Sequence, residues 1–443
     1  MTALIARARS ALSGRLAVPG DKSISHRAAI LGALAVGPSA VEGLLEGRDV
    51  LATIGALEAL GVAFTREGEG RWRIDGVGIA GLRESAKPLD LGNSGTGVRL
   101  LMGVAAGQPM TTTFCGDASL SRRPMARVMG PLERMGARIL ARAGGLLPVT
   151  ITGPETLLPL EHRIEVPSAQ VKSAILLAGL SAPGETIVIE PERTRDHTER
   201  MLKLFGARVA EETAPDGTRR IRLAGEPELS AQRLAVPGDI SSAAFPLAAA
   251  LARPGSRLTL ENVGVNPLRT GLIDTLAEMG ARLRLVNERQ SCGEPVADIE
   301  VEASPLKGVE VPPERAPRMI DEYPVLAVLA AGAEGRTVMR GLSELRVKES
   351  DRLAAIARGL EANGVRVEEL PDGLIVEGLS GRVPGGGVVA THLDHRIAMA
   401  FLTLGLASER AVTVDDASMI ETSFPGFVAL MNALGAEIAE AGP

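Results

Sequence analysis

The sequence predicts an α/β (α+β) protein of two domains, each assembled from three βαβαββ units. Three observations predict this class. The chain has 443 residues, which is too long for a single hydrophobic core. A glycine-containing pattern, first seen as LEALGVAF, recurs six times along the chain. The octapeptide LAVPGDKS returns almost unchanged as LAVPGDIS about half a chain later, which indicates two similar halves.

Each recurrence consists of an apolar helix end, a glycine, an alanine or valine, one further residue and an aliphatic residue. Glycine at this position is typical of a helix C-cap. A strand, a turn and a second strand follow most of these glycines, as in FTREGEGRWRIDG and VRVEELPDGLIVEG, where EGEG and PDG favour hairpins. The six glycines, at spacings of 70 to 84 residues, are Gly61, Gly136, Gly206, Gly280, Gly364 and Gly435.

Another helix is expected upstream in each unit, opened by a polar or glycine-rich loop. The last unit ends after one strand, AEIAEAG, so another segment has to complete it. The first residues resemble the tail of a unit, because ARSALSGRLAVPG is similar to LAGEPELSAQRLAVPG. We therefore expect a first domain of residues 1–20 plus 237–443, a second domain of residues 21–236, and crossings near 18–22 and 235–239.

Composition excludes several classes of protein. The formal charge is -6 and the chain has only seven Phe, one Trp and one Tyr, which disfavours nucleic-acid binding. The apolar runs are shorter than a membrane span, and arginines interrupt the N-terminal MTALIARARSALSG where a signal peptide is apolar. Cys115 and Cys292 lie far apart, outside any metal-ligand spacing. We expect a cytoplasmic, monomeric protein without nucleic-acid or membrane partners.

The two VPGD segments differ in charge. Asp21 is a candidate N-cap, and Ser23 and Arg27 lie one turn apart at the positive end of the same predicted helix. This face suits an anion, although an exposed basic surface is the alternative. In the second copy, Lys22, His26 and Arg27 are replaced by Ile240, Ala244 and Phe245, while Asp21 and Ser23 are matched by Asp239 and Ser241.

Other predicted helix starts also carry polar side chains. The loop GNSGTGVR places Gly95 and Arg99 where backbone N–H groups can approach a phosphate or carboxylate, although it is not a Walker A sequence. The segment PSAQVKSA offers Ser168, Gln170 and Lys172. In this acidic chain, cations recur at element starts among only a few acids: Lys22, Arg27, Arg123, Arg195, Lys348, Arg352 and Arg396.

Two carboxylates at those starts are candidates for proton transfer. Asp321 opens an apolar helix in MIDEYPVLAV, where helix capping is the alternative role. Glu349 lies between Lys348 and Arg352, and neighbouring cations favour its ionised form. His392 and His395 are three residues apart but have no further zinc-ligand pattern, and Cys115 is expected to be a strand residue rather than a nucleophile.

Essentially from end to end, the chain resembles the family of 5-enolpyruvylshikimate-3-phosphate synthases, or 3-phosphoshikimate 1-carboxyvinyltransferases. The matching motifs, in family order, are PGDKSISHR, GNSGTG, RP at 123–124, SAQVKSA, DEYP, RVKESDR and DHRIAM. The resemblance implies a two-domain inside-out α/β barrel with helix N-termini facing the cleft. It also implies carboxyvinyl transfer from phosphoenolpyruvate to the 5-hydroxyl of shikimate 3-phosphate, with no metal and no organic cofactor.

The resemblance also implies roles for individual residues. Glu349 is the candidate proton donor, Asp321 the candidate acceptor of the hydroxyl proton, and Lys22 a further candidate for proton transfer or charge stabilisation. Residues implied for shikimate 3-phosphate are Lys22, Ser23, Arg27, Ser168, Ala169, Gln170, Arg195, Asp321 and Lys348. Those implied for phosphoenolpyruvate are Gly95, Arg123, Arg352, His395 and Arg396.

Some residues depart from the commoner family pattern and resemble its divergent bacterial class. SAQ replaces SSQ, NSGT replaces NAGT, and Leu100 and Thr422 stand where many members have proline and lysine. Glyphosate inhibits many members by occupying the phosphoenolpyruvate site. Because certain resistant enzymes have alanine at the position of Gly95, the resemblance implies a glyphosate-sensitive enzyme.

Two other functions are alternatives. A UDP-N-acetylglucosamine enolpyruvyl transferase would need a cysteine in a mobile loop, whereas Cys115 is expected in a strand. A non-catalytic anion-binding protein, such as a solute receptor, would need export, for which no signal is visible.

Overall fold

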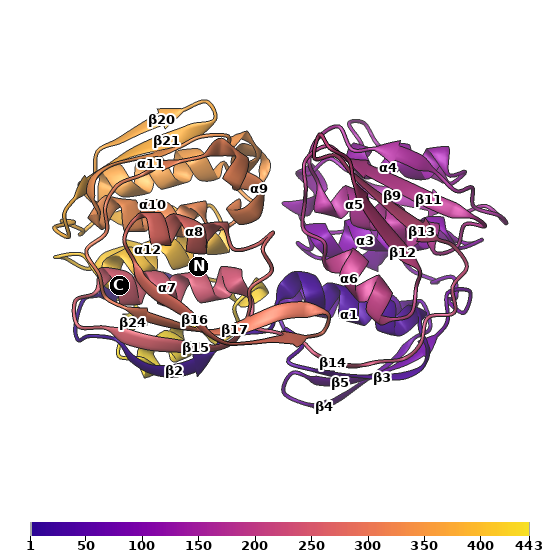
Figure 1. Cartoon of the computed structure of the whole chain (residues 1–443), viewed down its shortest axis with the longest axis horizontal. Helices are drawn as coiled ribbons and strands as arrows, with labels where there is room; N and C mark the ends of the chain where they lie inside the picture. The colour runs from indigo at the N-terminus through magenta and orange to yellow at the C-terminus, as the bar shows by residue number, and fades with distance from the viewer. Residues whose placement is uncertain (1, 443) are drawn as a thin grey trace. The chain divides into compact units, whose positions relative to one another are not determined.

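A computed structural model describes residues 2–442, and these residues form two compact units (Figure 1). Unit 1 comprises the chain up to Pro19, Gly238–Arg289, and the chain from Pro295 onward. Unit 2 comprises Gly20–Pro237 and the short segment Gln290–Glu294. This segment, the tip of a long hairpin, was not anticipated from the sequence, since pairing of its own strands does not reveal where a hairpin tip packs. Met1 and Pro443, the ends of the expected first domain, lie outside the described residues.

Unit 2 contains three repeats of strand, helix, strand, helix, strand, strand, as predicted. In each sheet the first two strands are parallel, and the hairpin that ends the repeat adds two antiparallel strands. The sheet orders are β14-β3-β5-β4, β6-β7-β9-β8 and β10-β11-β13-β12. The first repeat consists of β14 (Arg233–Ala235), α1 (Lys22–Leu34), β3 (Val36–Glu42), α2 (Arg48–Ala59), β4 (Ala63–Gly68) and β5 (Arg71–Val77).

The other repeats of unit 2 follow in chain order. The second consists of β6 (Leu89–Asp90), α3 (Gly95–Ala106), β7 (Thr111–Cys115), α4 (Ala126–Arg134), β8 (Arg138–Arg142) and β9 (Leu146–Thr152). The third consists of β10 (Glu161–Arg163), α5 (Ala169–Gly179), β11 (Glu185–Glu190), α6 (His197–Leu204), β12 (Val209–Thr213) and β13 (Arg219–Ala224).

Unit 1 repeats the same arrangement. Its first sheet contains β2 (Ser13–Ala17), β15 (Arg257–Gly264), β16 (Arg282–Ser291) and β17 (Glu294–Glu302), with α7 (Ile240–Ala252) and α8 (Gly271–Glu278). Its second contains β18 (Glu310–Val311), β19 (Glu334–Met339), β20 (Val367–Leu370) and β21 (Gly373–Leu379), with α9 (Ala316–Met319), α10 (Tyr323–Gly332) and α11 (Arg352–Ala362).

The third sheet of unit 1 combines both ends of the chain. It contains β22 (Val388–Val389), β23 (Val412–Val414), β24 (Glu437–Glu440) and β1 (Leu4–Arg7), with α12 (His395–Gly405) and α13 (Phe427–Ala433). Strand β1 lies between β23 and β24 and is antiparallel to both. The N-terminal strand thus provides the partner that the sixth repeat lacks.

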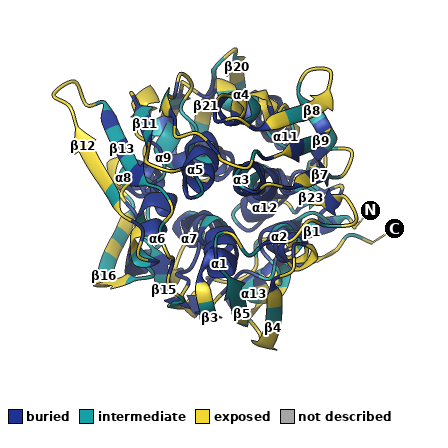
Figure 2. Cartoon of the chain, turned by 90° about the vertical axis from the view of Figure 1, so that its right-hand side faces the viewer, coloured by how far each residue is buried: buried dark blue, intermediate teal, exposed yellow. Residues whose placement is uncertain are grey.

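The first helix of every repeat lies inside its unit, with the sheets outside, which is the inside-out arrangement implied by the family resemblance. Every residue of α12 is buried, and α7, α10 and α12 pack against one another. In unit 2, α3 packs against both α1 and α5, and Figure 2 shows these helices mainly in the colour of buried residues. Because these helices are covered on all sides, they are apolar over nearly their whole circumference.

The glycines that define the six-fold pattern follow helices, as predicted. Their φ angles are all positive, from 79° at Gly364 to 106° at Gly136. A side chain with a Cβ is strained in this left-handed region, so glycine ends each helix at low cost. No helix within residues 2–442 combines the length and the apolar character needed to cross a membrane.

Candidate active site

The N-terminus of α1 in unit 2 carries the first group of candidate residues. Asp21 caps the helix, as predicted, because its side chain accepts a hydrogen bond of 2.9 Å from the backbone N–H of Ile24. Lys22 is half-buried, and its Nζ lies 3.1 Å from Oδ2 of Asp49 in α2. An acidic side chain therefore orients the lysine at this helix start.

Arg27 lies one turn further along α1 and is buried. Its guanidinium donates to Ser173 Oγ and Thr198 Oγ1, both at 2.6 Å, and to the carbonyl of Ser23 at 2.8 Å. Burial lowers the pKa of Arg27 to about 10, which still leaves it protonated at neutral pH. The structure therefore places this arginine against hydroxyl groups of α5 and α6.

The GNSGTG loop begins α3, with Ser94 as the N-cap that accepts from the N–H of Gly97. Arg123 follows the 3-10 helix Leu120–Arg122, and its Nη2 donates to Asn93 Oδ1 at 2.7 Å. A Cβ built on Gly95 would lie 2.9 Å from Arg99 Nη1 and 3.1 Å from Arg123 Nη1. A methyl group here would press on two guanidinium groups.

The third group in unit 2 surrounds the start of α5. Ser168 caps this helix through Val171 N–H, Ala169 is its first residue, and Gln170 donates to Thr96 Oγ1 at 2.9 Å. Arg195 is half-buried in the loop that leads into α6. All candidate residues of unit 2 thus lie at helix starts or in the loops before them, except Arg27, which lies one turn inside α1.

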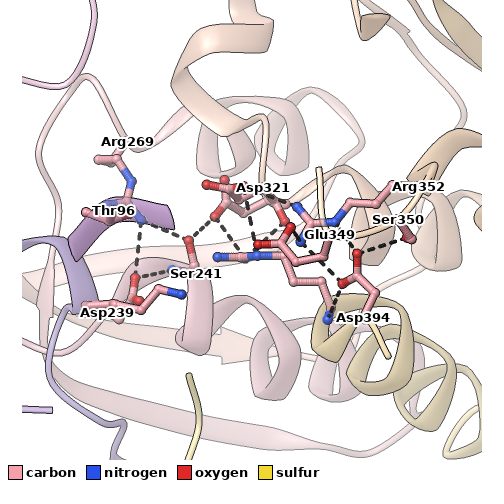
Figure 3. A network of polar contacts seen from close by, with 12 residues as sticks. Thr96, Asp239, Ser241, Arg269, Asp321, Glu349, Ser350, Arg352 and Asp394 are labelled. Carbon is pink, nitrogen blue, oxygen red and sulfur yellow. Dashed lines mark hydrogen bonds and ion pairs between the residues drawn. The ribbon is translucent and has the colours of Figure 1, made fainter. Parts of the chain in front are cut away.

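Arg352 is the centre of the candidate residues in unit 1 (Figure 3). Its side chain is only 1% exposed, and it contacts three carboxylates: Asp394 at 2.8 Å, Glu349 at 2.6 Å and Asp321 at 3.4 Å. Burial alone would lower the pKa of Arg352, but the carboxylates, led by Asp394, outweigh burial and raise it. Arg352 therefore connects both candidate proton-transfer residues through one permanent positive charge.

Asp394 is the N-cap of α12, where it accepts from the N–H of Arg396 at 2.9 Å. Burial would raise the pKa of Asp394, but the charge of Arg352 lowers it overall. Arg396 donates to the carbonyl of Asp321 at 3.1 Å. His395 is buried beside it, whereas Lys348 is half-buried just before Glu349.

A second arm of this network begins at the other VPGD segment (Figure 3). Asp239 caps α7 and lies 3.2 Å from Arg269 Nη2, which also donates to Ser241 Oγ at 2.8 Å. Ser241 donates in turn to the buried carboxylate of Glu322. Glu322, rather than Asp321, occupies the N-cap position of α10, although its side chain makes no capping hydrogen bond there.

The expectation that the cations lie among only a few acids is wrong for unit 1. Asp321, Glu322, Glu349 and Asp394 surround Arg352 and Arg396. Six residues of the networks in the two units were not predicted from the sequence: Asp49, Ser173, Thr198, Arg269, Glu322 and Asp394. The motif DHRIAM contains Asp394 directly before the helix start, and this N-cap position was the available signal.

Cys115 is the last residue of β7, which confirms its prediction as a strand residue. Burial raises the pKa of its thiol, so it is a poorer nucleophile than an exposed cysteine. In the part of the chain that the structure describes, no three His, Cys, Asp or Glu residues are grouped so as to hold a metal ion.

The six-repeat architecture defines the class of protein: it is the fold of enolpyruvyl transferases. The crystal structure of the enolpyruvyl transferase NikO from Streptomyces tendae matches over 100% of both chains with a TM-score of 0.74, and at 20% identity this likeness concerns the fold alone. The structure of EPSP synthase from Acinetobacter baumannii has a TM-score of 0.88 and 44% identity, covering 99% of this chain and 100% of that one.

Sequence relatives identify the particular family. The family model of EPSP synthase (3-phosphoshikimate 1-carboxyvinyltransferase) matches residues 6–431. A 3-phosphoshikimate 1-carboxyvinyltransferase of Parvibaculum lavamentivorans is 60% identical over 98% of this chain and 96% of its own length. One from Methylobacterium sp. is 61% identical over 99% and 98%. The chain belongs to the EPSP synthase family.

Proposed function

We infer that this protein transfers the carboxyvinyl group of phosphoenolpyruvate to the 5-hydroxyl of shikimate 3-phosphate and releases phosphate. The observation that carries this inference is the family match over residues 6–431, together with relatives of about 60% identity over nearly the whole chain. The reaction belongs to the shikimate pathway. Neither alternative function explains a match of this extent.

Charge balance supports the proposed substrate contacts. Each substrate has one carboxylate and one phosphate of about -1.5 to -2, so the pair brings roughly five to six negative charges. Arginine binds such groups through two parallel hydrogen bonds. We assign shikimate 3-phosphate to Lys22, Ser23, Arg27, Ser168, Ala169, Gln170, Arg195, Asp321 and Lys348, and phosphoenolpyruvate to Gly95, Arg123, Arg352, His395 and Arg396.

The proposed mechanism is addition followed by elimination through a tetrahedral intermediate. Glu349 donates a proton to the methylene carbon of phosphoenolpyruvate while the hydroxyl attacks the adjacent carbon. Asp321 accepts the hydroxyl proton, and Lys22 offers charge stabilisation or a second route for that proton. Both carboxylates contact Arg352. A substrate anion that binds this guanidinium would weaken its ion pair with Glu349. The pKa of Glu349 would then rise, so that this residue could carry the proton that it donates.

Release of inorganic phosphate in the presence of both substrates tests the function. We expect phosphate release only when shikimate 3-phosphate and phosphoenolpyruvate are supplied together. Replacement of shikimate 3-phosphate by UDP-N-acetylglucosamine distinguishes the related transferase. The proposal would be contradicted if phosphate were released from phosphoenolpyruvate with UDP-N-acetylglucosamine but not with shikimate 3-phosphate. Binding of both proposed substrates without turnover would also contradict it.

A further inference from the structure

Lys172 lies on the second turn of α5 with a side chain that is 0% exposed. Its Nζ lies 2.9 Å from Glu190 Oε2 and 2.8 Å from Glu199 Oε1, and both of these side chains are also 0% exposed. It also donates to the carbonyl of Thr194 at 3.4 Å. Burial of charged groups is costly unless they satisfy one another. The mechanism proposed above assigns no role to this cluster.

The buried cations and carboxylates of the cluster compensate one another. Arg219 Nη1 lies 3.8 Å from Glu190 Oε2, so two cations and two carboxylates lie together in the interior, and Arg219 also pairs with the partly exposed Glu211. Removal of one member would leave an uncompensated charge in the interior of unit 2. Removal of one cation together with one carboxylate would keep the balance.

The three partners of Lys172 bracket a single loop. Glu190 is the last residue of β11, Thr194 lies within the loop, and Glu199 lies in the first turn of α6. Thr194 also donates its hydroxyl to Glu190. Lys172 thus holds both ends and the middle of the segment that contains Arg195, the proposed ligand of shikimate 3-phosphate.

The same ion pairs lie next to the groups that hold Arg27. The two side chains that accept from Arg27 are Ser173 and Thr198, which are the immediate neighbours of Lys172 and Glu199 in the chain. Their hydroxyl oxygens are 2.7 Å apart. The Lys172–Glu199 pair therefore keeps α5 and α6 in the register that places both hydroxyls against the guanidinium of Arg27.

We propose that Lys172 is a positioning residue for shikimate 3-phosphate: through Glu190, Thr194 and Glu199 it fixes the loop that carries Arg195 and the two helices that hold Arg27. The inference rests on the proposed function. It assigns Lys172 no contact with substrate. Its loss should therefore weaken the binding of one substrate and leave that of the other unchanged.

The test is the charge-balanced double variant Lys172→Met/Glu199→Gln. We expect an increase of about 10- to 100-fold in KM for shikimate 3-phosphate, because displacement of binding groups by about 1 Å has effects of this size. The KM for phosphoenolpyruvate should stay at the wild-type value. When Arg195 is already replaced by Gln, the double variant should raise KM for shikimate 3-phosphate by a smaller factor than it does in the wild type. The reason is that both changes act through Arg195.

The matched control is Arg222→Met/Glu212→Gln, which removes an exposed ion pair of 3.0 Å between β12 and β13 that does not contact the cluster. This variant should keep both KM values. A folded Lys172→Met/Glu199→Gln protein with unchanged KM for shikimate 3-phosphate overturns the proposal, as does an equal rise in both KM values. If the double variant does not fold, Thr194→Val, which removes only one hydroxyl from the loop, decides on the same criterion.

The wild-type assay separates this inference from the function on which it rests. A wild type that releases no phosphate contradicts the function. An active wild type with an unaffected double variant contradicts only the role of Lys172.

Discussion

At the scale of single residues, the polar networks show how similar helix starts come to carry different chemistry. Asp21 and Asp239 both cap helices, but Lys22 next to the first pairs with Asp49, whereas the apolar Ile240 follows the second. Asp239 instead binds Arg269. Both helices have an aspartate as N-cap because it accepts a hydrogen bond from a free backbone N–H group of the first turn. The residue after the cap does not make this bond, so it can differ between the two helices.

Glu349→Gln should abolish turnover and largely preserve binding of shikimate 3-phosphate. The amide can still accept a hydrogen bond from Arg352 but cannot donate a carboxylic proton, and loss of general acid catalysis costs about 10²- to 10⁴-fold. Steady-state rates and calorimetric titration measure the two effects. Glu361→Gln, on the exposed face of α11, is the control. Near wild-type turnover of the first variant would exclude Glu349 as the acid.

Gly95→Ala should raise KM for phosphoenolpyruvate and raise the inhibition constant of glyphosate by a larger factor. The new methyl would displace Arg123, a proposed ligand, by a few tenths of an ångström, and glyphosate is the longer of the two molecules. Inhibition kinetics compare the constants. Gly130→Ala is the control, since a Cβ there meets no atom within 4 Å. Equal shifts in both constants would contradict selective steric exclusion.

His26 should make the stability of unit 2 depend on pH. Burial lowers its pKa from 6.5 to about 3, so below pH 6.5 the unfolded chain takes up a proton that the native state does not. The free energy of unfolding is therefore unaffected by the protonation of His26 above pH 6.5 and decreases as the pH falls toward 3. At pH 5 the loss is about 2 kcal/mol. Urea unfolding followed by Trp72, the single tryptophan, measures it. His26→Asn, which can still bond Thr53, should give a shallower pH dependence; an unchanged slope would contradict the assignment.

At the scale of elements, one repeat architecture is used six times, and in one case its strands come from both ends of the chain. Strand β1 pairs with β23 through Leu4 and Val414, and with β24 through Ala6 and Ile438. Without β1, both neighbouring strands would expose unpaired edges. The sheet therefore requires residues that are more than 400 positions apart.

Ala6→Asp should therefore loosen this sheet. Ala6 is 0% exposed, and a buried carboxylate without a partner costs several kcal/mol, in the range of the largest single-residue effects. Hydrogen exchange should show lost protection in β23 and β24. Arg7→Gln, on the exposed side of the same strand, is the control and should change protection little, because it brings no negative charge opposite Glu437. Full protection in the Ala6 variant would contradict the role of β1.

The whole molecule has two separate hydrophobic cores, and both are built from the same repeated arrangement of helices and strands. Each core is built from the inner helices of its own unit and the inner faces of its three sheets. Unit 1 cannot complete its third sheet until the last residues are available, whereas all three sheets of unit 2 lie within Gly20–Pro237.

Shikimate 3-phosphate should stabilise unit 2, where most of its proposed ligands lie. At 100 times its dissociation constant, a ligand that binds only the native state adds about 2.7 kcal/mol. The urea midpoint reported by Trp72 should rise accordingly. Inorganic phosphate at the same concentration serves as the control for general anion effects. An equal shift with both additives would contradict specific binding.

From the amino-acid sequence we could predict the six repeats, the glycines that end their helices, the helix starts that carry the candidate residues, and the family resemblance. These features are local, because a cap, a turn or a motif involves residues a few positions apart. Which charged side chains contact one another could not be predicted, because it depends on how the helices pack. Arg352 binds Asp394, which lies 42 positions away, and Lys172 selects Glu190 and Glu199 in the interior of unit 2. The packing of helices sets such pairs, and no local spacing encodes it.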